Sequence, residues 1–108
     1  MADEALVIVS CPANDAQSLA RTLIEEQLAA CVSVLPGVKS FYTWKKELCE
    51  EEETLLFIKT SKRKFSALES RICQIHSYEI PEIICLSIEK GYAPYLDWLN
   101  QSLISSTK

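Results

Sequence analysis

The five cysteines and the single histidine are the side chains of this 108-residue chain with the most specific chemistry. No two cysteines are separated by just two residues, so the Cys-x-x-Cys spacing of a structural zinc site is missing. An odd number of cysteines and the lack of a secretory signal argue against a disulfide framework. We therefore expect most of them to be small buried side chains in a reducing compartment. The cysteines are Cys11, Cys31, Cys49, Cys73 and Cys85, and the histidine is His76.

Cys11 and His76 form the strongest candidate pair for metal binding. Cys11 ends the first predicted strand, and His76 shortly precedes the last one. If these strands are antiparallel neighbours, both residues lie at the same end of the sheet. A thiolate and an imidazole suit copper or zinc, and sulfur favours Cu(I). We expect the third ligand to be Glu79, Glu82 or a residue of a neighbouring chain, with Cys11, His76 and Glu79 as the first choice.

His76 also has a structural interpretation. It follows a predicted helix, where a histidine commonly interacts with the C-terminal end of the helix dipole. The sequence leaves both interpretations open.

The elements that must position these residues follow from hydrophobic periodicity. Predicted strands cover residues 5–11, 31–35 with 38–44, 54–60 and 83–88. Predicted helices cover residues 15–29, a segment capped by Ser61 that reaches Ile75, and a segment that begins near Pro94. The order β-α-β-β-α-β with a C-terminal helix predicts an α+β, ferredoxin-like split βαβ fold.

Four consecutive glutamates occupy residues 50–53. Side chains on an extended segment alternate in direction, so these carboxylates cannot all reach one ion. We expect a solvated hairpin tip or the exposed end of a strand, which would also deter aggregation.

Length and composition limit the function classes. The chain predicts a single domain over residues 1–108, with an ordered core at about 5–104 and a fraying end at 105–108. The net charge of −4 disfavours nonspecific nucleic-acid binding. No apolar run is long enough to span a membrane, and the acidic start is unlike a signal peptide, so we expect a cytoplasmic protein without membrane contact.

The predicted strands 54–60 and 83–88 offer apolar side chains to both faces of the sheet. The helices of a split βαβ unit cover only one face. Large exposed apolar patches usually mark interfaces, so we expect the second face to be buried in a homo-oligomer.

Several segments together resemble the CutA divalent-cation tolerance family. The resemblance runs from about residue 6 to 104, and its motifs are specific in combination. They are residues 28–32 (LAACV), 36–45 (PGVKSFYTWK), 55–60 (LLFIKT), 76–84 (HSYEIPEII) and 95–99 (YLDWL).

The resemblance implies a ferredoxin-like subunit in a homotrimer, with strand pairing between subunits similar to that of the PII signalling proteins. It also implies tolerance to divalent cations, especially copper, and no organic cofactor. The polar-tipped residues in the family motifs would converge in clefts between subunits. They are Trp44, Lys59, His76, Tyr78 and Glu82.

An ammonium, an imidazole, a phenol and a carboxylate beside an aromatic wall could hold a small anionic ligand. The structural alternative is that Trp44 and Tyr78 pack at the interface while Lys59 and Glu82 form an ion pair. Two positions depart from the family pattern. Ser77 replaces a usual proline, which would leave its loop less rigid, and Lys46 replaces a common glycine in the hairpin turn.

Three functions follow as hypotheses. The first is copper tolerance by a trimer that binds or senses the metal. The second is a PII-like trimer that binds a small anionic metabolite or nucleotide and signals to a partner. The third is a structural scaffold. No nucleophile, phosphate-binding or dinucleotide motif occurs, so we do not expect an enzyme.

Overall fold

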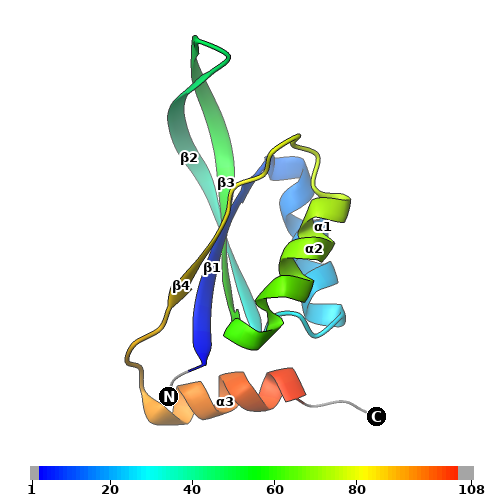
Figure 1. Cartoon of the computed structure of the whole chain (residues 1–108), viewed down its shortest axis with the longest axis vertical. Coiled ribbons are helices and arrows are strands. Elements are labelled where there is room, and N and C mark those ends of the chain that lie inside the picture. Colours follow the sequence, from blue (N-terminus) through cyan, green and yellow to red (C-terminus); the bar gives the residue numbers. More distant parts are fainter. Residues whose placement is uncertain (1–2, 105–108) are drawn as a thin grey trace.

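The computed structural model describes residues 3–104 and has the predicted order of elements (Figure 1). The segments 1–2 and 105–108, including the end expected to fray, lie outside the described residues. The strands are β1 (Glu4–Cys11), β2 (Cys31–Trp44), β3 (Glu47–Ser61) and β4 (Ile83–Ser87). The helices are α1 (Ala13–Glu25), the short 3-10 helix η1 (Lys62–Lys64), α2 (Phe65–Ile75) and α3 (Ala93–Ile104). The α+β split βαβ prediction is confirmed.

The four strands form one sheet in the order β2-β3-β1-β4, and every neighbouring pair is antiparallel. The predicted pairing of the first and last strands is therefore confirmed. Helices α1 and α2 pack on one face of the sheet (Figure 1). The core between them joins alternate residues of β1 and β3 to the apolar stripes of both helices. Its fully buried members include Val7, Val9, Leu56, Ile58, Leu23 and Leu68.

Helix α1 ends earlier than the periodicity predicts, at Glu25 rather than near residue 29. Gln27 adopts φ 57°, a left-handed conformation that ends helices. The chain then reverses into β2, so the apolar residues after Gln27 pack as a connection and not as a further helical turn.

The hairpin of β2 and β3 is longer than predicted, and this changes where the acidic run lies. Its tip is the two-residue turn Lys45–Lys46, between the paired residues Trp44 and Glu47. Residues 50–53 therefore lie inside β3. Of the two predicted alternatives the hairpin tip was wrong, because residues 38–41 of β2 pair with these glutamates and hold them in the ladder. The exposed outer part of a strand describes Glu50, Glu51 and Glu52, whereas Glu53 is buried.

Pro36 and Gly37 form a bulge in β2 instead of ending it. Leu35 pairs with Leu55 and Val38 pairs with Glu53, so two residues of β2 oppose one residue of β3. Gly37 takes φ 75°, which glycine adopts without strain. The extra residue reverses the alternation of β2, so beyond the bulge the even-numbered side chains share a face with the odd-numbered side chains of β3.

The sheet face opposite α1 and α2 is largely apolar, and within residues 3–104 helix α3 packs against the end of it that carries Glu4. We call it the open face. It carries Leu6 and Ile8 of β1, Leu55 and Phe57 of β3, and Ile84 and Leu86 of β4. Ile84 and Leu86 are 48% and 44% exposed. Helix α3 crosses the end of the sheet near Glu4, whose carboxylate accepts a 2.7 Å hydrogen bond from Asn100. No helix of the described part is long and apolar enough to cross a membrane.

Candidate ligand-binding cleft

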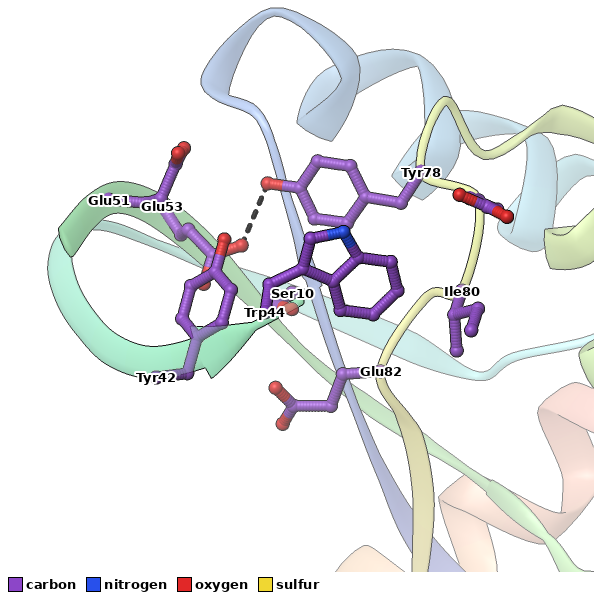
Figure 2. A pocket seen from close by; sticks show the side chains of 9 residues that line it. Ser10, Tyr42, Trp44, Glu51, Glu53, Tyr78, Ile80 and Glu82 are labelled. Atoms are coloured by element: carbon purple, nitrogen blue, oxygen red, sulfur yellow. Dashed lines mark hydrogen bonds between the residues drawn. The ribbon is translucent and has the colours of Figure 1, made fainter. Parts of the chain in front are cut away.

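A cleft of about 490 Å³ lies between the outer part of the hairpin and the segment that joins α2 to β4 (Figure 2). Four glutamates and three aromatic side chains make up most of its wall, together with Ser10 and Ile80. The glutamates are Glu51, Glu53, Glu79 and Glu82, and the aromatic residues are Tyr42, Trp44 and Tyr78.

The hairpin supplies one side of the cleft through its register. Beyond the bulge, Tyr42 and Trp44 point to the same face as Glu51 and Glu53, because Tyr42 pairs with Cys49 and Val38 with Glu53. Glu50 and Glu52 point the other way, and Glu50 lies 3.4 Å from Lys39. The alternation thus divides the acidic run into two cleft residues and two residues on the opposite side.

The segment after α2 supplies the other side of the cleft, and hydrogen bonds of His76 hold the backbone of this segment in place. The His76 Nδ1 atom accepts a 3.0 Å hydrogen bond from the backbone N–H of Tyr78. The neutral ring then carries its proton on Nε2, which donates to the Ser10 carbonyl oxygen at 2.7 Å. Ser77 donates a 2.7 Å hydrogen bond to Asp15. This contact anchors the segment to α1, where the lack of a proline had predicted a less rigid loop.

Tyr78 reaches across the cleft to Glu53. Its hydroxyl donates a 2.7 Å hydrogen bond to Glu53 Oε2, and the Glu53 residue is only 7% exposed (Figure 2). Burial, followed by this hydrogen bond, raises the pKa of Tyr78 well above its usual range. Burial and then the Glu51 charge also raise the pKa of Tyr42. Both phenols are therefore held neutral beside carboxylates.

Some residues of the two predicted sites meet here. Of the predicted ligand-binding set, the cleft wall contains Trp44, Tyr78 and Glu82. His76 stands behind Tyr78, with the two ring centroids 4.8 Å apart. Lys59 does not line the cleft: its Nζ atom donates to Ser33 Oγ at 3.3 Å, between β3 and β2. Of the predicted metal ligands, Glu79 lines the cleft.

Cys11 lies on the other side of the sheet from the cleft, within the core under α1 and α2. It is fully buried, and burial, with smaller contributions from Asp15 and Glu53, raises the pKa of its thiol to about 11. Both ring nitrogens of His76 already have backbone partners. Among residues 3–104, no group of three or more His, Cys, Asp or Glu side chains is arranged to hold a metal ion. One subunit in this conformation therefore does not fit a metal ion on Cys11, His76 and Glu79.

Sequence reasoning missed Tyr42, Glu51 and Glu53. The alternation of the acidic run, which the sequence does reveal, could have assigned every second glutamate to one face. Which aromatic residues of β2 share the face of Glu51 and Glu53 could not be read from the sequence, because the extra residue of the bulge places Tyr42 rather than Phe41 on that face.

The charge in the cleft favours a positively charged ligand. Four of its nine lining residues are glutamates, and none is lysine, arginine or histidine. Because low-dielectric aromatic walls strengthen this field, an anion would be repelled from the cleft of a single subunit.

Comparison with known proteins points to one family. The family model described as "CutA1 divalent ion tolerance protein" matches residues 5–102. The Divalent-cation tolerance protein CutA of Thermus thermophilus is 41% identical over 100 residues, which are 92% of this chain and 97% of that protein. The CutA homolog of Xenopus laevis is 50% identical over 93 residues, which are 84% of this chain but only 61% of that longer protein.

Solved structures share the fold. The apo structure of the PII-like protein CutA from Nostoc sp. PCC 7120 superposes with a TM-score of 0.86 at 33% identity and covers 92% of this chain and 96% of the Nostoc chain. The resemblance noted in the sequence motifs is thus supported by both the sequence and the three-dimensional structure.

Proposed function

This chain belongs to the CutA1 divalent ion tolerance protein family, and from that premise we propose that it acts in divalent-cation tolerance, copper above all, as a homotrimer that binds or senses the metal. The observation that carries the proposal within the structure is the acidic cleft. Its four glutamates attract cations and lie beside the open face through which subunits would assemble, so a neighbouring subunit would have to supply the further ligands that a metal ion needs.

The assembly part of the proposal is supported by continuity between the open face and the cleft. Ser10 on β1 and Glu53 on β3 continue the same alternation as Ile8 and Leu55. A subunit packed on the open face would therefore approach the cleft, and its side chains could complete the cleft wall. Burial of Leu6, Ile8, Leu55 and Phe57 would supply the association free energy.

The copper part of the proposal rests on family membership, because a single subunit does not arrange the predicted ligands Cys11 and His76 around one ion. Because these side chains are already buried or hydrogen-bonded, copper binding needs its own test. Titration calorimetry with Cu(I) and Cu(II) should show stoichiometric binding that weakens in Cys11→Ala and in His76→Ala. Cys73→Ala is the matched control, since it removes an exposed cysteine of α2. Unchanged binding in both test variants would dismiss this metal site.

A second candidate function is PII-like binding of a small molecule in the cleft, which the volume of the cleft and the Nostoc relative favour. An anionic metabolite bound between subunits predicts a thermal shift that is lost on Lys59→Ala, since Lys59 lies outside the cleft wall of one subunit. The glutamates of the cleft argue for a positive charge on the ligand.

We also propose a cytoplasmic location, supported by five free cysteines.

A further inference from the structure

The cleft combines features that the metal hypothesis does not use. Besides its carboxylates it has three aromatic side chains, and it is large enough for a ligand of several non-hydrogen atoms. We propose that this cleft binds a small organic cation that carries an ammonium or guanidinium group. This inference goes beyond divalent-cation tolerance and requires no metal.

The aromatic walls come from both sides of the cleft. Tyr42 and Trp44 project from β2, and Tyr78 projects from the segment after α2 (Figure 2). In one subunit Tyr42 and Trp44 are 41% and 40% exposed, so part of each side chain is accessible to a ligand. The face of an aromatic ring attracts an organic cation, and the attraction is strongest where water is excluded. Hydrated inorganic ions would gain less from these rings, because they would first have to lose water.

Glu53 supplies a second and independent indication. The residue is 7% exposed, yet its carboxylate has Tyr78 as its one hydrogen-bond partner and forms no salt bridge within residues 3–104. A buried carboxylate without a cationic partner is costly. Glu50, its exposed neighbour in the same run, does have a cation in Lys39. A bound ammonium or guanidinium group would supply the missing partner of Glu53.

The arrangement also distinguishes an organic cation from the other two ligand classes. An anion would meet four glutamates. A bare metal ion needs several ligand atoms converging on one point, and the described carboxylates do not provide such a group. An extended cation can instead place its charge near Glu53 and Glu82 and its carbon chain against Trp44.

Calorimetric titration of the full chain with agmatine, which carries a guanidinium and an ammonium group, tests the proposal. We expect saturable binding that weakens about tenfold in Glu82→Gln, equivalent to about 1.4 kcal/mol. Trp44→Leu should weaken it about fivefold, whereas Trp44→Phe should largely preserve it. Glu50→Gln is the matched control, because it removes one carboxylate charge that points away from the cleft, on the opposite side of the hairpin. Circular dichroism should show that each variant is folded.

Four outcomes would overturn the assignment. The first is an absence of saturable agmatine binding to the wild-type chain. The second is weakening in Glu82→Gln with none in Trp44→Leu, which would indicate a carboxylate ion site without aromatic recognition. The third is tighter binding of inorganic pyrophosphate than of agmatine, which would restore the anionic class. Equal weakening by Glu50→Gln and Glu82→Gln would also count against the cleft, because it would indicate only the overall negative charge.

Discussion

The Tyr78 hydroxyl donates a 2.7 Å hydrogen bond to the buried Glu53 carboxylate and so joins the segment after α2 to the middle of β3. The two residues are 25 positions apart in sequence and approach the cleft from opposite sides. This contact joins two walls of the cleft, because Tyr78 and Glu53 both line it.

Tyr78→Phe should destabilise the protein by about 1–3 kcal/mol, because it leaves Glu53 buried without its donor. Urea unfolding at a fixed protein concentration measures the change. Tyr92→Phe is the control, since Tyr92 is 77% exposed, and it should shift the unfolding free energy by less than about 0.5 kcal/mol. In Glu53→Gln, further replacement of Tyr78 by Phe should cost much less. Equal costs in both backgrounds would contradict the coupling.

Cys11 should resist alkylation in the folded protein, whereas the exposed Cys73 should react. Burial excludes the reagent and raises the pKa of the Cys11 thiol to about 11, so little thiolate forms at pH 8. Iodoacetamide labelling followed by peptide mass spectrometry measures both sites in one sample. Rapid labelling of Cys11 without loss of the fold would contradict the buried placement.

The same thiol predicts a dependence of stability on pH. Its folded pKa lies above its ordinary value of 9.0, so its contribution is fully present below pH 9 and is lost as the pH rises towards about 11. The unfolding free energy of the wild type should therefore fall more steeply over this range than that of Cys11→Ala. Parallel curves for the two proteins would refute this linkage.

Lys46→Gly should stabilise the hairpin by about 1 kcal/mol. Lys45 and Lys46 take φ 52° and 68°, left-handed values that cost a residue with a Cβ atom about 1–2 kcal/mol and glycine little. Thermal unfolding should show a higher midpoint for Lys46→Gly. Lys46→Ala is the control and should bring no such gain, since alanine keeps the Cβ atom.

Phe57→Asp should prevent or weaken assembly, because it places a charge in the middle of the open face. Light scattering of the wild type at micromolar concentration should give three times the mass of one chain, and the variant should give less. Tyr92→Asp puts the same charge on an exposed residue of the loop between β4 and α3, outside the sheet, and should keep the wild-type mass. A monomeric wild type would overturn the trimer.

The fold could be predicted because it depends on periodicity. The alternation of β1 and the helical spacing of Leu19, Leu23, Leu68 and Ile72 determine which surfaces pack, and these surfaces are the ones that form the core. The predicted element boundaries were wrong where the backbone conformation of one or two residues determines whether an element ends or continues. Gln27 ends α1 by a left-handed conformation, and Pro36–Gly37 continues β2 as a bulge although the same dipeptide is typical of a turn.

The cleft could be predicted only in part. Trp44, Tyr78 and Glu82 lie in conspicuous motifs, and the structure brings them together. Lys59 is in an equally conspicuous motif, but its position on β3 carries it to Cys31 and Ser33, which lie across the hairpin. Glu53 has the same residue type as its three neighbours in the run, and only the register of the hairpin and the approach of Tyr78 make it buried.

The bulge at Pro36–Gly37 divides the hairpin into an inner part, which packs on the core, and an outer part, which lines the cleft. Near the core, the alternation of β2 is fixed by what α1 must cover; beyond the bulge it is out of phase with that requirement. Deletion of the extra bulge residue would restore regular alternation along β2 and keep Tyr42 and Trp44 on the cleft side, because the turn at Lys45–Lys46 holds Trp44 opposite Glu47. The aromatic side of the cleft is therefore set by the register at the hairpin turn, and the bulge accommodates the one residue by which β2 exceeds β3 between Leu35 and Trp44.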